Sequence, residues 1–243
     1  MHYFVTGATG FIGKRLVQKL LQRRGAVVHF LVRKASQDKV PALLAHWGVG
    51  PERAIAVVGD LSESKLGLSS SAVRALKGKI HHFFHLAAIY DLKADADSQL
   101  AANVDGTRHA VALANEIKAG CFQHVSSIAA AGLYDGVFRE DMFEEADNLD
   151  HPYFLSKHES EKVVRKTCQV PWRVYRPGLV VGDSQTGQMD KVDGPYYFFK
   201  LIQKMRSLLP PWMPTLGIEG GRINIVPVDF VVDAMDAIAH KPH

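Results

Sequence analysis

Short apolar runs alternate with longer amphipathic segments along most of the chain. The short runs are rich in β-branched and aromatic residues, which favour buried strands, whereas the longer segments repeat apolar residues every three to four positions, as helices do. Six runs are predicted to be strands, at residues 2–6, 27–32, 54–58, 81–87, 122–126 and 172–175. Because strands that alternate with helices wind into a parallel sheet, the pattern predicts an α/β fold with a doubly wound parallel sheet.

Three of the predicted helices are defined by their periodicity. In the first, Ile12, Leu16 and Leu20 share one face and Lys14 lies on the other. This arrangement predicts that the helix packs on the sheet. The second helix is expected from about residue 97 to 118 and the third from about 152 to 166.

The regular alternation ends after Gly178, and residues 183–224 are rich in glycine, proline and aromatic residues. An irregular insertion of this length is usually functional, and we expect it to bind substrate. The chain returns to a strand-like run at residues 223–228, with Asp229 as the predicted N-cap of the last helix.

We therefore divide the chain into a doubly wound domain, 1–182, an insertion, 183–224, and a returning strand and helix, 225–243. A doubly wound domain of this kind normally gains another strand at its end. We expect the chain to be an excerpt of a longer polypeptide, with the missing C-terminal portion as a partner.

Composition narrows the functional classes. A chain of 243 residues with 47% hydrophobic and 22% charged content can bury a large core, which excludes disordered and collagen-like proteins. The formal net charge of +4 is carried by spread lysines and arginines, so no nucleic-acid partner is expected. No secretion signal is recognised at the first residues, so a cytoplasmic location is predicted. The two cysteines, Cys121 and Cys168, have neither metal-ligand spacing nor disulfide density.

A glycine-rich turn follows the first strand and opens the first helix, with the sequence Thr6-Gly7-Ala8-Thr9-Gly10-Phe11-Ile12-Gly13. Gly7 permits a tight turn, Gly10 lets the backbone approach a pyrophosphate, and Gly13 allows close packing of the helix. The helix N-terminus adds free N–H groups and a positive dipole. The turn therefore predicts a Rossmann dinucleotide site, with cofactor contacts from Thr6, Gly7, Thr9, Gly10, Phe11, Ile12 and Gly13.

Residues at the ends of the next strands refine the cofactor. The second strand ends at Arg33 rather than at the Asp or Glu that binds an NAD ribose, which favours the 2′-phosphate of NADP(H). Lys34 is either a helper or a solvated loop charge. Asp60, with Leu61 beside it, is placed to meet the adenine edge or else caps the next turn. The small Ala87 and Ala88 would let the backbone run under the cofactor, although small residues are also ordinary in strand packing.

A tyrosine and a lysine four residues apart share one face of the third helix. A tyrosine, with a free pKa of about 10, is a poor acid near neutrality. The ammonium of Lys157 would lower the pKa of Tyr153 and stabilise its phenolate. Ser127, at the end of the fifth strand, would donate a second hydrogen bond to the same substrate oxygen. Ser127, Tyr153 and Lys157 are the predicted catalytic residues.

Together these motifs resemble the extended short-chain dehydrogenase/reductase superfamily. The resemblance also rests on Asn103 in 103–107 and on Arg176-Pro177-Gly178. It implies that Ser127 and Tyr153 bind and protonate a carbonyl oxygen and that Lys157 also binds the cofactor ribose. It further implies that the Pro177 and Gly178 backbone borders the nicotinamide. Asn103 corresponds to a proton-relay position, or else it bends its helix. Ser126 is the less favoured serine, because the superfamily places its catalytic hydroxyl five residues before the glycine that matches Gly132.

A closer resemblance is to the N-terminal reductase domain of bacterial fatty acyl-CoA reductases, the male-sterility type. It rests on residues 82–91, 138–145 and 189–200. It implies NADPH-dependent reduction of a long-chain acyl-CoA to an aldehyde, and a second hydride would give the alcohol. The alternatives are a fatty aldehyde reductase or another enzyme of this superfamily with a hydrophobic substrate. A non-catalytic NADP sensor is disfavoured by the intact catalytic residues.

The insertion contains a basic amphipathic pattern at residues 198–209. Its apolar face predicts a lid over an aliphatic chain, a peripheral membrane contact, a homodimer face or plain core packing. Charges interrupt any run long enough to span a membrane. The twelve histidines show no metal-ligand spacing, because alternation along a strand separates His81 from His82. No metal is predicted.

Overall fold

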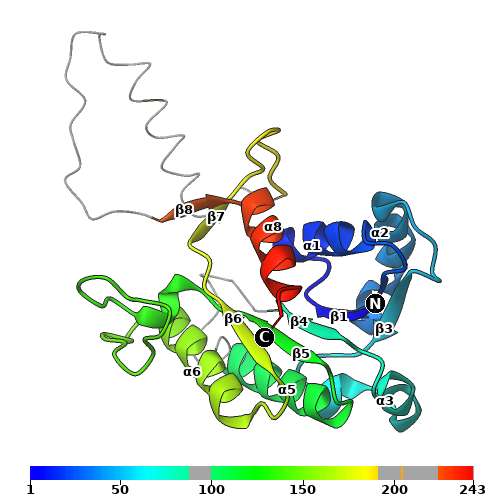
Figure 1. Cartoon of the computed structure of the whole chain (residues 1–243), viewed down its shortest axis with the longest axis horizontal. Helices are drawn as coiled ribbons and strands as arrows, with labels where there is room; N and C mark the ends of the chain where they lie inside the picture. The colour runs from blue at the N-terminus through cyan, green and yellow to red at the C-terminus, as the bar shows by residue number, and fades with distance from the viewer. Residues whose placement is uncertain (88–99, 191–203, 205–223, 243) are drawn as a thin grey trace.

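The computed structural model describes residues 1–87, 100–190, 204 and 224–242 (Figure 1). Six strands form one parallel sheet in the order β3-β2-β1-β4-β5-β6. They are β1 (His2–Thr6), β2 (Val27–Val32), β3 (Ala54–Val58), β4 (His82–His85), β5 (Cys121–Val125) and β6 (Trp172–Tyr175). The strand order reverses between β1 and β4, as in doubly wound nucleotide-binding folds. The predicted fold class and all six strands are confirmed, with shifts at the ends of the fourth and fifth.

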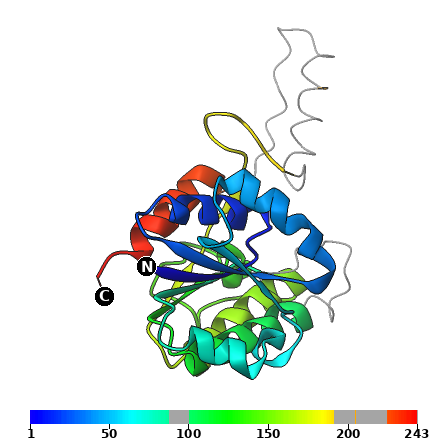
Figure 2. The same ribbon diagram turned by 90° about the vertical axis from the view of Figure 1, so that its right-hand side faces the viewer.

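Helices cover both faces of the sheet (Figure 2). One face packs against α1 (Phe11–Leu21), α2 (Val40–Trp47) and α8 (Val228–Ala239), and the other against α3 (Ser70–Leu76), α5 (Gly106–Glu116) and α6 (Pro152–Thr167). Each face has its own hydrophobic core, with Tyr3 and Phe30 in the first and Phe4 and Phe83 in the second. Alternation along the strands produces this division, because neighbouring side chains point to opposite faces.

The second predicted helix is not one continuous α-helix. Within the part of 97–118 that the structure describes, a π-helical turn, η3 (Ala101–Asp105), precedes α5, and the α-helix ends at Glu116. Inside the turn, the backbone carbonyl of Asn103 accepts a hydrogen bond from the Thr107 side chain at 2.6 Å. A π-helical turn interrupts the regular ladder of backbone hydrogen bonds, so the side-chain periodicity alone did not predict it.

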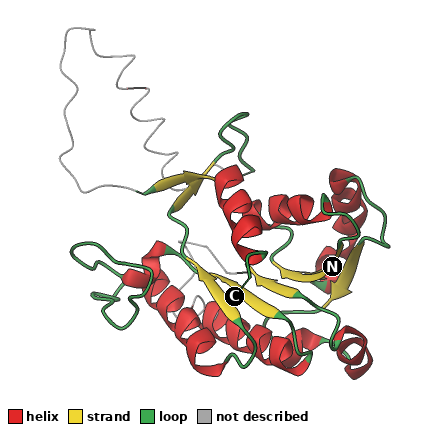
Figure 3. Cartoon of the chain, in the orientation of Figure 1, coloured by secondary structure: helices red, strands yellow, loops and turns green. Residues whose placement is uncertain are grey.

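A small second sheet stands apart from the main one (Figure 3). It pairs β7 (Leu179–Val181) with β8 (Ile225–Pro227) in parallel. Helix α8 follows β8 directly, and the prediction of Asp229 as its N-cap is wrong: Pro227 holds that position. Asp229 lies in the first turn and accepts hydrogen bonds from the backbone and hydroxyl of Ser184, at 2.9 and 2.6 Å. Its carboxylate also lies favourably at the positive end of the helix dipole.

Aromatic side chains gather at the amino edge of the sheet. The rings of His2 and His29 stack 5.7 Å apart, and His82 lies 4.9 Å from the ring of His240. Burial, together with the positive charge of neighbouring groups, lowers the pKa of His29 and of His82 to about 4. Because an imidazole in the unfolded chain titrates near 6.5, the unfolded state binds more protons between pH 6.5 and 4.

We therefore expect the stability that these histidines contribute to be complete above pH 6.5 and to fall as the pH decreases toward 4. The midpoint of urea unfolding should be lower at pH 5.0 than at pH 7.5, and the substitution His29→Gln should reduce this difference. The control is His46→Gln, a change at an exposed side chain. Equal midpoints at the two pH values would contradict the expectation.

Candidate active site

The glycine-rich turn forms a cradle in which side chains do not fit. Gly7 has a φ of +74°, and a Cβ added there would lie 2.7 Å from the amide nitrogen of Ala87. A Cβ on Gly13 would overlap the carbonyl oxygen of Gly7. Gly10 is the N-cap of α1 and provides no side chain to satisfy the helix N–H groups. The turn therefore fits a dinucleotide pyrophosphate, which needs close backbone approach and free N–H donors.

Beside this cradle, hydrogen bonds join the end of β1 to the residues that follow β4. The amide of Ala87 donates to the hydroxyl oxygen of Thr6 at 3.3 Å, and the amide of Leu86 donates to the Thr6 carbonyl at 3.2 Å. Thr9 and Gly10 are exposed at the mouth of the turn, and Phe11 and Ile12 are half-buried behind it. Ala88 lies outside the described residues, so its predicted cofactor contact stays a prediction.

Arg33 and Asp60 follow neighbouring strands, β2 and β3. Arg33 is exposed, and among the residues that the structure describes its guanidinium forms no ion pair. The Asp60 carboxylate accepts hydrogen bonds from the backbone and hydroxyl of Ser62, at 2.9 and 2.8 Å. These bonds lower the pKa of Asp60, and the charge of Arg33 adds to the effect. Asp60 thus caps its own turn, and the carbonyl of the neighbouring Leu61 accepts from His109 at 2.8 Å.

Helix α6 holds Tyr153 and Lys157 on one face. His151 caps the helix by accepting from the Tyr153 amide at 3.2 Å, and Pro152 fits the first helical position. Lys157 is only 7% exposed, and its Nζ lies 5.9 Å from the centroid of the Tyr153 ring. Burial lowers the pKa of Lys157 to about 8. The ammonium is therefore still mostly charged at neutral pH, and it can stabilise a phenolate at Tyr153.

Ser127 and the Pro177–Gly178 turn lie together at the carboxyl ends of β5 and β6. Ser127 begins the short helix η4 (Ile128–Ala131), and its Oγ accepts from the Ala129 amide at 3.1 Å. The Ile128 amide donates to the Pro177 carbonyl at 3.1 Å. The Ser126 hydroxyl, by contrast, is buried and has no hydrogen-bond partner within the described part of the chain. Ser127 is thus the serine held next to the turn that is predicted to border the nicotinamide.

Sequence reasoning missed a buried acidic residue on α6, the helix that carries Tyr153 and Lys157. Glu161 is fully buried and forms a two-point ion pair with Arg176, at 3.0 and 2.6 Å, and a further bond with Arg165 at 2.9 Å. Arg176 also donates to the carbonyl of Met142 at 2.9 Å. Glu161 follows Lys157 by four residues, and this spacing is the signal that places it on the same face.

This ion pair joins the segments around the predicted site. Arg176 directly precedes Pro177, and Phe143, next to Met142, stacks on His158 of α6 with ring centroids 4.3 Å apart. Nδ1 of His158 forms a hydrogen bond with the carbonyl of Ala130 in η4 at 3.0 Å. The helix that carries Tyr153 is therefore fixed to the Ser127 turn, to the Pro177 turn and to the segment around residue 143.

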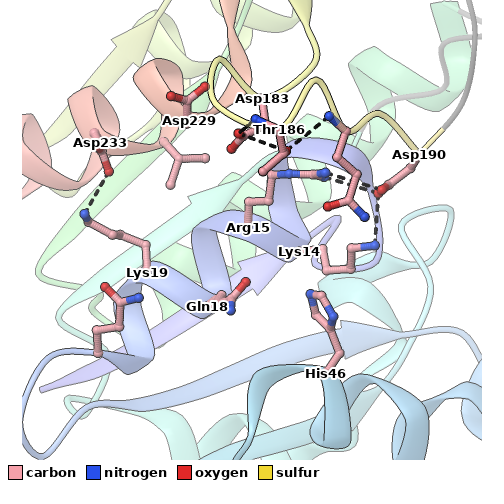
Figure 4. A pocket seen from close by; sticks show the side chains of 13 residues that line it. Lys14, Arg15, Gln18, Lys19, His46, Asp183, Thr186, Asp190, Asp229 and Asp233 are labelled. Carbon is pink, nitrogen blue, oxygen red and sulfur yellow. Dashed lines mark hydrogen bonds and ion pairs between the residues drawn. The ribbon is translucent and has the colours of Figure 1, made fainter.

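A polar groove of about 270 Å³ lies on another part of the surface, between α1, α8 and the loop before residue 191 (Figure 4). Its lysine and arginine side chains pair with aspartates. Asp190 binds both Lys14, at 3.0 Å, and Arg15, at 3.3 Å, while Lys19 binds Asp233 at 2.8 Å. None of the predicted catalytic residues lines this groove. These ion pairs hold the first residues of the insertion, 183–190, against α1.

The described residues offer neither a metal site nor a membrane span. No group of three or more His, Cys, Asp or Glu side chains there could hold a metal ion. No helix in that part of the chain is long and apolar enough to cross a membrane. The amphipathic pattern at 198–209 lies outside the described residues apart from Lys204.

Comparisons of the sequence and of the structure with known proteins point to the same family. A family model described as Male sterility protein, an NAD-binding domain, matches residues 5–235. A linear gramicidin synthase of Brevibacillus parabrevis is 33% identical over 78% of this chain, and aldehyde reductase lnbA of Aspergillus flavus is 28% identical over 99%. The terminal R domain from the myxalamid PKS-NRPS biosynthetic pathway is 27% identical over 99% of this chain, with a TM-score of 0.80.

The similar proteins are longer than this chain. It spans 4% of the gramicidin synthase polypeptide, 25% of the aldehyde reductase and 62% of the solved R domain. The family match, in contrast, extends over nearly all of the chain and includes the glycine-rich turn and α6. The chain therefore belongs to the male sterility protein family, which consists of NAD(P)-binding oxidoreductase domains of the extended short-chain dehydrogenase/reductase superfamily.

Proposed function

We propose that the chain reduces an acyl thioester to an aldehyde with NADPH as the hydride donor. The observation that carries the proposal is the face of α6 on which the buried ammonium of Lys157 lies 5.9 Å from the centroid of the Tyr153 ring. Long-chain fatty acyl-CoA is the substrate that the sequence favours. The similar proteins are named as a linear gramicidin synthase, an aldehyde reductase and an R domain of a PKS-NRPS pathway, so the acyl group and its thiol carrier are the variables to test.

The residues divide the chemistry among them. When bound, the nicotinamide supplies a hydride to the thioester carbonyl carbon. Tyr153 gives its phenolic proton to the carbonyl oxygen while Ser127 donates a hydrogen bond to the same oxygen, which together stabilise the developing negative charge. Lys157 stabilises the resulting phenolate and holds the ribose. The Tyr153 phenolate then takes back the hydroxyl proton of the hemithioacetal as the C–S bond breaks, and the leaving thiolate takes a proton from solvent, giving aldehyde and free thiol.

Cofactor preference rests on Arg33. We expect Arg33→Ala to raise the KM for NADPH about tenfold to a hundredfold and to leave the KM for NADH nearly unchanged. A charge-assisted hydrogen bond to the 2′-phosphate is worth about 1.5 to 3 kcal/mol, and NADH lacks that phosphate. The control is Lys39→Ala, an exposed charge at the end of η1 (Lys34–Lys39). Equal losses with both cofactors would contradict the role.

Direct reduction of an aldehyde is the second candidate, and the name of the relative lnbA favours it. NADPH absorbance with purified protein separates the two functions. Consumption with palmitoyl-CoA or a shorter acyl-CoA supports thioester reduction, whereas consumption with the matching aldehyde alone supports the second candidate. No consumption with any thioester or aldehyde would contradict both functions and favour a non-catalytic NADP-binding role.

Most of the insertion lies outside the residues that the structure describes. The substrate-binding role of 183–224, the cytoplasmic location and the partners other than substrate stay predictions. Those partners are a peripheral membrane surface, a homodimer and a further portion of the same polypeptide.

A further inference from the structure

A buried imidazole joins two threonines below the predicted active site. Nδ1 of His85 lies 2.8 Å from the hydroxyl of Thr6, and Nε2 of His85 lies 3.1 Å from the hydroxyl of Thr107. The Thr107 hydroxyl in turn donates to the backbone carbonyl of Asn103 at 2.6 Å. All three side chains that form this chain of bonds are at most 2% exposed. Water therefore does not compete for these hydrogen bonds.

The number of available hydrogens fixes the direction of each hydrogen bond in this series. The Thr107 hydroxyl donates its single hydrogen to the Asn103 carbonyl, so it must accept a hydrogen bond from His85. Nε2 of His85 therefore carries the proton. Burial, together with the charges of His124 and Lys157, holds the pKa of His85 well below its ordinary value, so the ring is neutral. Nδ1 is then an acceptor, and the Thr6 hydroxyl donates to it. Thr6 in turn accepts from the Ala87 amide.

The same array reaches the catalytic helix. The side-chain amide of Asn103 donates to the Ser156 hydroxyl at 3.2 Å, and that hydroxyl donates to the Tyr153 carbonyl at 2.9 Å. Asn103 occupies the π-helical turn η3, a distortion that is frequent at functional sites. A series of hydrogen bonds thus connects Thr6, at the start of the glycine-rich turn, with the first turn of α6. At Asn103 the path passes from the backbone carbonyl to the side-chain amide of the same residue.

His124 provides a natural contrast on the neighbouring strand. Its ring stacks on that of His85 with centroids 5.7 Å apart and an interplanar angle of 18°. It is 3% exposed, and within the described part of the chain neither of its ring nitrogens has a hydrogen-bond partner. Two histidines of equal size and similar burial therefore differ mainly in their hydrogen bonds.

We propose that His85, as the neutral Nε2–H tautomer, is a positioning residue that sets the catalytic helix relative to the cofactor cradle. Its ring acts through Thr6 on the glycine-rich turn and through Thr107 and Asn103 on Tyr153. This inference rests on the proposed function for its kinetic consequence, because a small displacement between hydride donor and proton donor slows the reaction. Its structural content, the tautomer and the coupling to cofactor binding, does not depend on the substrate.

The first test observes the tautomer directly. Nitrogen-15 NMR of the full chain with labelled histidine, assigned by the signal lost in His85→Gln, should show the proton of His85 on Nε2 at pH 7. A proton on Nδ1, or a mixture of the two tautomers, would overturn the proposal. This measurement uses the wild-type protein and does not require that any variant be active.

The second test compares variants by kcat per folded molecule. His85→Leu removes both hydrogen bonds and should lower kcat about tenfold to a hundredfold. His85→Gln places an amide donor near Thr107 and should recover most of the loss. The control, His124→Phe, removes a buried ring without partners in the described residues, so kcat should stay within about twofold and the urea midpoint should rise. Wild-type kcat in His85→Leu would overturn the proposal.

Fluorescence titration with NADPH separates this proposal from the proposed function. If the wild-type protein binds NADPH but reduces no thioester or aldehyde, the proposed function fails. The His85 proposal then still predicts weaker NADPH binding in His85→Leu than in His124→Phe, and equal binding in the two variants would overturn it.

Discussion

Replacing Tyr153 with phenylalanine is expected to lower turnover about a hundredfold or more while leaving the affinity for NADPH near normal. The substitution removes only the hydroxyl that we propose protonates the substrate oxygen, and loss of a positioned proton donor costs about 10² to 10⁴ in rate. The ring and the helix cap at His151 are retained, so the cofactor cradle should be unchanged. Steady-state kinetics and NADPH titration on the same preparation measure both quantities.

The control for this change is Tyr134→Phe. Tyr134 packs edge-on against Phe138, and its hydroxyl has no hydrogen bond among the described residues, so turnover should be retained. A parallel loss of turnover and NADPH affinity in Tyr153→Phe would indicate a damaged fold. Unchanged turnover would show that Tyr153 is not the proton donor.

Glu161→Gln is expected to lower the free energy of unfolding by about 3 kcal/mol or more. Burial alone would raise the pKa of Glu161, but the hydrogen bonds and charges of Arg176 and Arg165 hold it below its ordinary value. The carboxylate is therefore charged at neutral pH. Glutamine keeps the shape but leaves two guanidinium groups without their counter-charge, and breaking a buried ion pair costs about 3 to 5 kcal/mol.

Urea unfolding of Glu161→Gln and Glu159→Gln makes the comparison. Glu159 lies on the same helix and pairs with Lys162 at 2.9 Å, but both side chains are about one-third exposed. Exposed pairs are worth about 0 to 1 kcal/mol, so the control should change little. Similar unfolding midpoints for the two variants would show that the buried pair does not anchor the segments around Tyr153.

Local signals predicted the sheet and the cofactor cradle because both depend on short stretches of chain. Short apolar runs defined the strands, and the glycines from Gly7 to Gly13 lie within one short turn. The π-turn at η3 was not predicted as such, because it enlarges a single turn and so shifts the helical pattern only locally. The alternative in which Asn103 bends its helix was the expectation that pointed to a distortion there. The prediction of Asp229 as an N-cap was wrong for a different reason. Its position in the sequence resembles a cap, but its hydrogen-bond partner, Ser184, lies 45 residues away.

Within the candidate site, too, residues that depend on local spacing were predictable and residues that depend on distant partners were not. Tyr153 and Lys157 were predictable because four residues of helix bring them to one face. The roles of Glu161 and His85 depend on partners in other elements, 15 and 22 residues away at Arg176 and Thr107. Their burial and pairing arise only when the strands are ordered in the sheet.

Isotope transfer tests the central claim most directly. The full protein is incubated with an acyl thioester and NADPH that carries deuterium at the transferable C4 position, and the product is analysed by mass spectrometry. The account predicts one deuterium at C1 of the aldehyde, or two at C1 if reduction continues to the alcohol, with release of free thiol. An unreacted thioester, or an aldehyde without deuterium, would contradict hydride transfer at this site.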